Sequence, residues 1–375
     1  MNDRLYSLLI KTVPKPAVRW TAWTQWQPDP ALCGRIASVL RRERAQGGVL
    51  ALMDARRGIT SAAFGIDRLR EQIAAQPDHF FRAASISKFV TAAAALRLAE
   101  DGRIDLDRDV SDWLGFPVRH PGAPQKPITL RLLIAHRAGL RDGTAYQAAL
   151  AKPQPVQALL HADSFTEHRP DEGFEYSNFG AGLVGAILEA ALGQPFNDIV
   201  LSVLPLDCGG ATFLPQQVRG VLADAWRLMP PSRMPNYDAA ARQAQPLREM
   251  DVRLDYLTAH GGLCVTASGL LKLAQWTLET PACRTMRVPL SSFGRRDPCL
   301  REGLGCFIYQ DSALPFPLYG HQGLAYGAVH GLFFREETPP EGIYGFAFLS
   351  SAVSEQRSGV ITAVNRDIAR AIWKA

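Results

Sequence analysis

A serine and a lysine three residues apart, Ser85 and Lys88, are the first side chains in this sequence whose spacing could do chemistry. They open a stretch, residues 85–100, that is apolar on almost every side and predicts a centrally buried helix. Residues three apart share a helix face, so the hydroxyl and the ammonium can meet. A serine hydroxyl is a weak nucleophile that needs an adjacent base, and the positive helix end favours an alkoxide and a deprotonated lysine. The alternative is that Ser85 only caps the helix while Lys88 extends to solvent.

A tyrosine and an asparagine, Tyr176 and Asn178, form a second candidate pair between the turn-forming residues 170–173 and a helix expected from Ala181. A lysine ammonium nearby can lower the pKa of a tyrosine, so that its phenolate acts as a general base. The Asn178 amide could hydrogen-bond a substrate amide and Lys88 together. The alternative is a core tyrosine with a satisfied hydroxyl, which is the commoner situation for an isolated tyrosine.

The sequence Gly-His-Gln-Gly at residues 320–323 lies on a predicted strand and forms a third candidate. Glycine lets another backbone approach closely, and N–H groups at a strand edge can form an oxyanion hole. We expect the donors to be the N–H groups of Ser85 and Leu324. His321 and Gly323 would line the pocket, with His321 facing the leaving group or carboxylate of the substrate. The alternative is a histidine that only packs.

The elements around these motifs predict a sheet built from both chain ends, with a helical part between them. Alternation and turn residues indicate strands at 49–53, 59–66, 304–309, 318–323, 329–334 and 344–349. Helices are expected at 30–44, 85–100, 129–135, 181–192, 268–276 and 358–373. We therefore expect an α+β fold with an α/β domain around a central antiparallel sheet (1–90 and 290–375) and a mostly helical lobe (91–289).

Taken together and in chain order, these segments resemble the class C β-lactamase and penicillin-binding-protein-like family. The resemblance runs from about Gly48 to the C-terminal helix and is carried by residues 81–110 with Ser-x-x-Lys, 128–140, 174–180 with Tyr-x-Asn, 261–263, and His321-x-Gly323. It implies the β-lactamase/transpeptidase-like fold, an antiparallel sheet flanked by helices plus an all-helical lobe, with the active site in the cleft between the α/β domain and the lobe. It also implies Ser85 as nucleophile, Lys88 as its activator, and Tyr176 as general base and then acid.

Two segments depart from the family pattern. The third motif usually reads Lys-Thr/Ser-Gly, whose cation and hydroxyl hold a substrate carboxylate, whereas His321 and Gln322 stand there in this sequence. Histidine is mostly neutral near pH 7, so weaker recognition of a free carboxylate is expected, which argues against an efficient β-lactamase. The residues after His136 usually read Thr-Ser, and here they are Arg137-Ala138, a change from which we derive no chemistry. We expect His136 to be a hydrogen-bonded structural histidine.

The composition argues against several other classes of protein. The formal charge is +5, from 41 basic and 36 acidic residues, and no basic run interleaved with aromatics indicates nucleic-acid binding. The six cysteines contain no C-x-x-C pair and the eight histidines no metal-ligand cluster, so we expect reduced thiols, no metal and no cofactor. No run approaches the ~18 apolar residues of a membrane span. The apolar run at residues 5–10 is too short for a signal sequence, so a cytoplasmic location is expected.

We therefore expect a serine hydrolase that forms an acyl-enzyme on Ser85 and hydrolyses an ester or a small amide. Its expected partner is a small-molecule ester, amide or β-lactam substrate, and β-lactamase or D-amino-acid peptidase activity is the alternative within this class. The alternative from another class is a catalytically inactive binding module, against which the intact set of Ser85, Lys88 and Tyr176 argues. The sequence indicates neither the physiological substrate nor the oligomeric state, because loops such as residues 211–237 supply the pocket walls.

Overall fold

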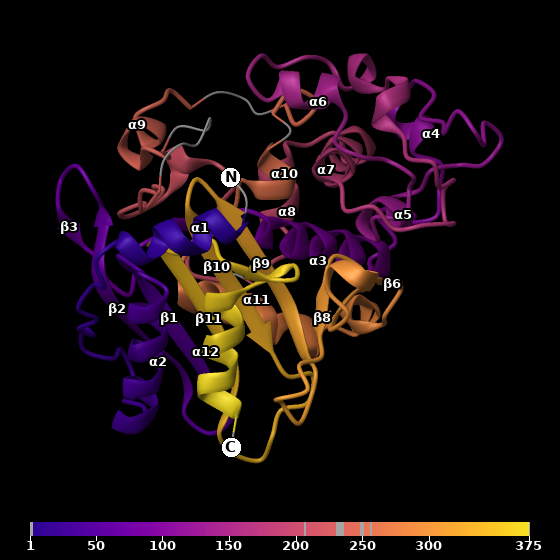
Figure 1. Ribbon diagram of the computed structural model, residues 1–375. Coiled ribbons are helices and arrows are strands. Elements are labelled where there is room, and N and C mark those ends of the chain that lie inside the picture. Colours follow the sequence, from indigo (N-terminus) through magenta and orange to yellow (C-terminus); the bar gives the residue numbers. More distant parts are fainter. Residues whose placement is uncertain (1–2, 206–207, 230–235, 248–250, 256, 375) are drawn as a thin grey trace.

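A computed structural model describes residues 3–205, 208–229, 236–247, 251–255 and 257–374 (Figure 1). Residues 230–235 of the loop expected to wall the pocket lie outside the described residues. Short pairs β4 (Phe81–Arg82) with β5 (Cys264–Val265) and β12 (Arg357–Ser358) with β13 (Ile361–Thr362) accompany one large sheet. None of the described helices is both long and apolar enough to cross a membrane.

The large sheet joins the two ends of the chain, and all of its pairings are antiparallel. In spatial order its nine strands are β3 (Ile73–Ala74), β2 (Gly58–Arg68), β1 (Gly47–Asp54), β11 (Ile343–Ala352), β10 (Ala328–Phe334), β9 (Leu318–Ala325), β8 (Phe307–Tyr309), β7 (Leu300–Glu302) and β6 (Ser291–Ser292). The β1–β11 pair is the seam, with Leu50 opposite Phe348. Figure 1 shows this seam as indigo strands beside yellow ones.

Alternating side chains of β1 enter two different cores, because successive residues of a strand point to opposite faces. Leu50 and Leu52 pack in the cluster shared with helices α2 (Pro30–Arg42) and α12 (Ala363–Trp373). Val49, Ala51 and Met53 pack in the other cluster, with helix α11 (Ala267–Glu279) and the buried helix α3 (Ile86–Glu100). The sheet is therefore covered by helices on both faces (Figure 1).

The helical lobe surrounds helix α7 (Asn178–Leu192), which contacts α3 and four helices of the lobe. The other α-helices here are α4 (Val110–Leu114), α5 (Leu130–Ile134), α6 (Thr144–Ala149), α8 (Phe196–Leu201), α9 (Ala239–Gln243) and α10 (Leu257–Gly261). The remaining helical segments are α1 (Asp3–Leu9) and the 3₁₀ turns η1 (Ile10–Thr12), η2 (Val156–Leu159), η3 (Ala162–Ser164), η4 (Pro215–Gln217), η5 (Pro281–Arg287) and η6 (Gly294–Arg296).

The structure confirms the α+β fold and corrects several element boundaries. The final helix begins at Ala363 rather than 358, because the preceding residues pair as β12 and β13. Helix α7 begins at Asn178 rather than 181, because the Ser177 hydroxyl caps it by accepting the Gly180 N–H at 2.9 Å. The division into two domains stays a prediction. Helix α11, expected in the helical lobe, packs against strands β1, β2, β10 and β11 of the sheet.

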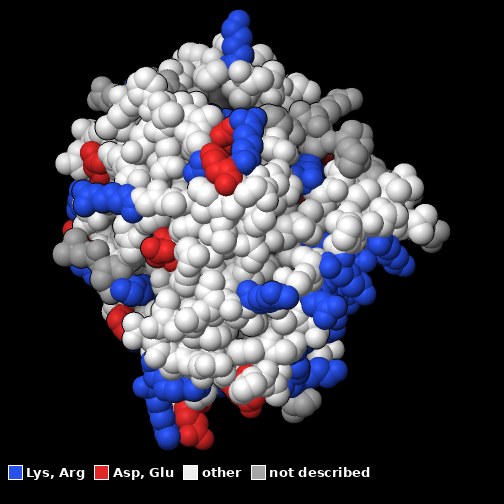
Figure 2. Space-filling view, turned by 90° about the vertical axis from the view of Figure 1, so that its left-hand side faces the viewer, with Lys and Arg blue, Asp and Glu red and all other residues white. Residues whose placement is uncertain are grey.

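Charged side chains are dispersed over the surface in Figure 2, which looks onto the left-hand side of the view in Figure 1. Basic side chains stand there in several separate groups within a mostly uncharged surface, and acidic ones lie beside some of them. The small formal charge of +5 is thus spread out on this face.

Candidate functional site

Ser85 occupies the N-cap position of helix α3, but its side chain makes no capping hydrogen bond. The hydroxyl instead lies 3.0 Å from Lys88 Nζ, as the spacing of three residues predicts. Ala84, directly before the serine, adopts the left-handed conformation with φ +49°, a strained turn for a residue with a side chain. The chain thus bends sharply to present a half-buried serine at the end of a buried helix.

Lys88 is enclosed, with 4% of its surface exposed, and its amine has three oxygen partners. Nζ lies 3.0 Å from Ser85 Oγ, 2.9 Å from Asn178 Oδ1 and 3.0 Å from the His260 carbonyl oxygen. Burial lowers the pKa of Lys88 to about 7, although the charge of Asp142 opposes the change. A neutral amine fits these partners, because it can donate to the two carbonyl oxygens and accept the proton of the serine hydroxyl.

Tyr176 lies beside this pair, with its ring centroid 5.0 Å from Lys88 Nζ. Its ring packs on His136 with centroids 4.4 Å apart. Burial raises the pKa of Tyr176 above its usual value of 10, and a hydrogen bond with Ser85 opposes the rise only in part. This direction corrects the expectation that the lysine would lower it. At neutral pH Tyr176 is therefore a phenol that can donate a proton, and Lys88 is the group closer to being a base.

Asp142 is a site residue that the sequence did not indicate. Its carboxylate accepts hydrogen bonds from Asn178 Nδ2 at 2.7 Å, from Ser177 Oγ at 3.1 Å and from the Phe179 N–H at 2.9 Å. With its amide nitrogen held in this way, Asn178 directs its carbonyl oxygen at Lys88. The expected contact between Asn178 and Lys88 is therefore present, and Asp142 orients it. A single aspartate in the loop between α5 and α6 has no periodicity or motif that could have revealed this role.

Three histidines stand near the site, and burial lowers the pKa of each, so all three are neutral. His136 Nδ1 accepts the Ser177 N–H at 3.1 Å, in agreement with the structural role expected for it. His260 contributes its backbone carbonyl to Lys88, while its ring Nε2 lies 2.8 Å from the Tyr146 hydroxyl. His321 has a pKa of about 3 and stacks on Phe307 with ring centroids 4.0 Å apart.

Strand β9 offers a free edge at the site, because β8 pairs with it only as far as Gly320. Ala325 and Ala328 flank the two-residue turn to β10 and form a hydrogen-bonded pair, so the next pair, Leu324 and Val329, is not hydrogen-bonded. The Leu324 N–H therefore points to the free edge. In agreement, the Val329 N–H donates to Ser350 Oγ on the other side of β10. Leu324 as an oxyanion-hole donor stays a prediction that this geometry supports.

Gly323 allows strand β9 to pack against the segment before the serine. A Cβ at this position would lie 2.2 Å from the Ala83 carbonyl oxygen, a separation that packed atoms cannot adopt. Glycine is thus required for the close approach of β9 to the residues leading into Ser85, as the sequence indicated.

His321 and Gln322 differ in what they present to the site. His321 lines the cavity with 1% of its surface exposed, and its Nε2 has no hydrogen-bond partner among the described residues. The Gln322 amide is engaged elsewhere, since Nε2 donates to the Val360 carbonyl at 2.7 Å and Oε1 accepts the Thr362 N–H at 3.1 Å. Neither residue supplies a cation or a free amide for a substrate carboxylate.

A second carboxyl group, Glu302 on strand β7, acts on the site through its charge. It is fully buried, and neither of its side-chain oxygens has a hydrogen-bond partner in the described part of the chain. Burial raises the pKa of Glu302 well above its usual value, and the charge of Lys88 opposes this rise. The sequence did not indicate this residue, because one glutamate on a short strand carries no pattern.

These groups line a cavity of about 600 Å³, whose walls include Ser85, Tyr176, Asn178, His321 and Leu324. The structure thus brings the predicted residues of all three motifs together. A nucleophile lies within hydrogen-bond reach of a base, and a backbone donor points to a free strand edge beside them, which is an arrangement suited to acyl transfer. The described residues contain no group of three or more His, Cys, Asp or Glu side chains placed to hold a metal ion.

Comparisons with known proteins found a matching family model and several relatives. The family model described as Beta-lactamase matches residues 34–370. A putative fimbrial assembly protein FimD, serogroup D, from Dichelobacter nodosus is 26% identical over 273 residues, which are 68% of this chain and 64% of that protein. Penicillin-binding protein 4* from Bacillus subtilis is 29% identical over 154 residues, 39% of this chain and 33% of that protein. The chain therefore spans less than two thirds of the length of these curated relatives.

Solved structures share the fold at low sequence identity. EstCE1, described as a hydrolase with promiscuous acyltransferase activity, gives a TM-score of 0.71 at 21% identity, with 91% of this chain and 98% of that chain covered. A D-stereospecific amidohydrolase from Streptomyces sp. gives 0.68 at 19% identity, with 92% and 98% covered. A D-amino acid amidase from Ochrobactrum anthropi gives 0.67 at 21% identity, with 91% and 96% covered.

Proposed function

Because this chain belongs to the Beta-lactamase family, we propose that it is a serine hydrolase that forms an acyl-enzyme on Ser85 and hydrolyses an ester or a small amide. The observation that carries the proposal is the Lys88 amine, which lies 3.0 Å from Ser85 Oγ and has its pKa lowered to about 7. A buried amine that is largely neutral at physiological pH is the activating base that a serine nucleophile requires.

Each proton has a donor and an acceptor in the proposed reaction. Lys88 takes the hydroxyl proton as Ser85 Oγ attacks the carbonyl carbon, and the N–H groups of Ser85 and Leu324 bind the resulting oxyanion. Tyr176 donates its proton to the leaving alcohol or amine and recovers one from the Lys88 ammonium. The C–O or C–N bond to the leaving group breaks, which leaves an ester on Ser85. Water then hydrolyses this ester by the same steps in reverse order.

The substrate class is proposed from the site and from the fold neighbours together. The neutral His321 and the engaged Gln322 provide no cation at the third motif, which favours an ester or a small amide over a β-lactam bearing a carboxylate. A D-amino acid amidase and EstCE1, a hydrolase with promiscuous acyltransferase activity, share the fold, which supports an acyl-transfer reaction on a small amide or a related acyl compound.

Covalent labelling tests the proposal. We expect a fluorescent fluorophosphonate to add its mass once to the intact protein, and Ser85→Ala to abolish both labelling and turnover of p-nitrophenyl butyrate while the fold is retained. Ser87→Ala is the matched control on the same helix, since the Ser87 hydroxyl is engaged with the Leu263 N–H at 3.0 Å, and it should still be labelled. Turnover by Ser85→Ala would refute the nucleophile, and no labelling of the unmodified protein would favour the inactive binding module. Labelling by a fluorescent penicillin as well would show that the site admits β-lactams.

A further inference from the structure

Arg82 stands where the Ser85 cavity meets a second cavity. It lies on the short strand β4, three residues before Ser85, and its side chain lines the 600 Å³ cavity that contains the serine. It also lines an adjoining cavity of about 290 Å³, and Leu150 and Tyr326 are likewise shared by both. A group bound at Arg82 could therefore belong to a substrate whose scissile bond is at Ser85.

The guanidinium of Arg82 is held in place by aromatic rings rather than by a carboxylate. Its Cζ lies 5.8 Å from the ring centroid of Tyr237 and 5.4 Å from that of Tyr326. No ion pair joins it to an acidic side chain of the described residues, in contrast to Arg227 of the same cavity, which is paired with Glu355. A guanidinium that rests on aromatic faces keeps its N–H edge available, and that edge matches the two oxygens of a carboxylate.

The surrounding charges single out Arg82 as the cation placed to bind an anion. Of the other arginines that line the Ser85 cavity, Arg227 is paired with Glu355, and Arg296 and Arg357 are exposed to solvent. Half-buried Arg82 is screened less by water and salt than these exposed groups. In the adjoining cavity, the charged residues of the described lining are Arg82, Arg242 and Asp255, so the described lining is positive overall.

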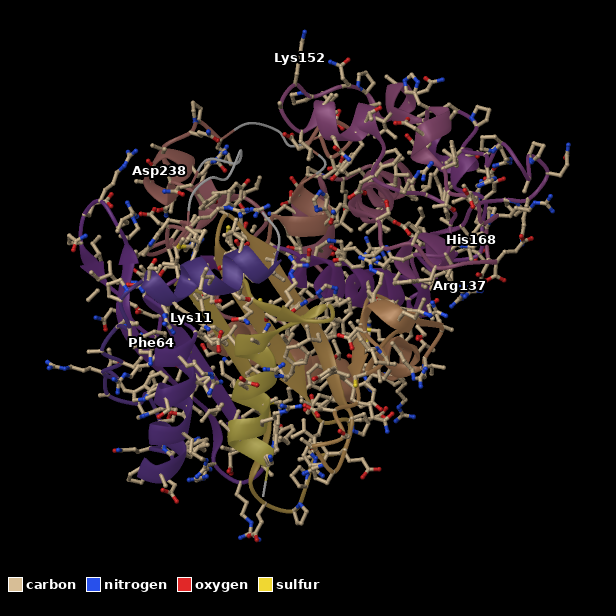
Figure 3. The ribbon with its side chains drawn as sticks, in the orientation of Figure 1. Lys11, Phe64, Arg137, Lys152, His168 and Asp238 are labelled. Atoms are coloured by element: carbon tan, nitrogen blue, oxygen red, sulfur yellow. The ribbon has the colours of Figure 1, made fainter. Side chains whose placement is uncertain are left out.

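Two separate segments of the helical lobe contribute to the lining of the adjoining cavity. One contains Leu150 and Pro153, next to the labelled Lys152 in Figure 3, and the other contains Tyr237 and Arg242, next to the labelled Asp238. Leu150, Leu254 and the tyrosine rings add apolar surface to these walls. The chemistry of the cavity therefore suits a short apolar stem that ends in an anionic group.

We propose that Arg82 is a specificity-determining residue that binds a carboxylate of the substrate, so that the preferred substrates are esters or amides carrying a carboxylate on the acyl or the leaving group. This inference rests on the proposed function and names its substrate class. It places the substrate-binding cation on β4, directly upstream of the nucleophile, and not on strand β9, where His321 is neutral and Gln322 is engaged.

Matched pairs of esters test this assignment. Mono-p-nitrophenyl glutarate against p-nitrophenyl valerate places a carboxylate on the acyl side, and 4-acetoxybenzoate against methyl 4-acetoxybenzoate places it on the leaving group. For at least one pair, we expect Arg82→Gln to lower the ratio of kcat/KM for the anionic over the neutral ester about 10- to 100-fold, mainly through KM. Arg82→Lys should restore part of the ratio. Arg296→Gln, which removes an exposed cation from the same cavity, should change it less than about threefold.

The neutral esters separate failure of this inference from failure of the proposed function. If Arg82→Gln turns over both neutral esters at the normal rate and leaves both ratios unchanged, the carboxylate site is refuted and the serine hydrolase stands. An equal loss caused by Arg296→Gln would also refute it, because the effect would then be a general one of charge. Absence of Ser85-dependent turnover of any ester by the unmodified protein would instead overturn the proposed function.

Discussion

The pH dependence of ester hydrolysis should reveal which group accepts the serine proton. Lys88 must be neutral to do so, and its pKa is about 7. The neutral fraction is then about 10% at pH 6 and about 90% at pH 8, so kcat/KM for a neutral ester should rise with pH along a limb centred near 7. Between pH 8 and pH 5 we expect a fall of roughly 100-fold, approaching tenfold per pH unit at the acid end.

The assay is stopped-flow or plate-based hydrolysis of p-nitrophenyl butyrate, with the uncatalysed rate subtracted at each pH. Glu302 is the nearby group that could imitate Lys88, because burial raises its pKa well above its usual value. Glu302→Gln keeps the shape of the side chain and should retain the limb, at the same pH or slightly lower, since the carboxylate charge would raise the pKa of Lys88. His321 will not contribute, since its pKa of about 3 lies below the range studied.

Two outcomes would refute this reasoning. A flat profile between pH 5 and 9 would mean that no group with a pKa near 7 controls the reaction. A limb that appears only above pH 9 would identify the Tyr176 phenolate as the base, contrary to the direction in which burial moves the pKa of that residue. Loss of the limb in Glu302→Gln would assign it to the glutamate.

Two substitutions test other parts of the site. Tyr176→Phe should lower kcat about 10²- to 10⁴-fold, because it removes the proton donor to the leaving group. Fluorophosphonate labelling of Ser85 should slow much less, because fluoride leaves without such a donor. A fall of only a few-fold in steady-state hydrolysis would remove the tyrosine from the mechanism. Gly323→Ala should lower the free energy of unfolding by about 1–3 kcal/mol and lower kcat/KM severely. The reason is that the new Cβ would lie 2.2 Å from the Ala83 carbonyl oxygen and force β9 away from the serine. Unchanged Tm and activity would show that this contact does not position the site.

Local patterns in the sequence were enough to predict the elements that carry the site. The apolar run after Ser85 predicts a helix, and the three-residue spacing places Ser85 and Lys88 on one face of it. The structure shows this contact, with Ser85 Oγ 3.0 Å from Lys88 Nζ. Strand β9 and the need for glycine at 323 could also be predicted from the sequence, because a residue without a side chain is the one that allows another backbone to approach closely. Neither prediction required knowledge of distant parts of the chain.

Features that depend on distant parts of the chain could not be predicted in this way. The contact of Asp142 with Asn178 joins a loop to the start of helix α7 across 36 residues, and no periodicity connects them. The direction of the Tyr176 pKa depends on how deeply the hydroxyl is buried relative to its distance from the lysine, which is a property of packing. The expected final helix was too long at its start because residues 357–362 pair with each other, and such short pairs leave little pattern in a sequence.

The seam between β1 and β11 has a consequence for how the protein reaches its folded state. Strand β1 ends at Asp54, whereas its partner begins only at Ile343, so a growing chain has completed β1 long before β11 has been synthesised. At ordinary translation rates of about 5–20 residues per second, the edge of the mostly apolar strand β1 stays unpaired for roughly 15–60 s. An unpaired edge of this kind readily pairs with other chains. We therefore expect nascent or refolding chains to depend on dilution or on chaperones, and slow closure of this seam to limit the overall folding rate.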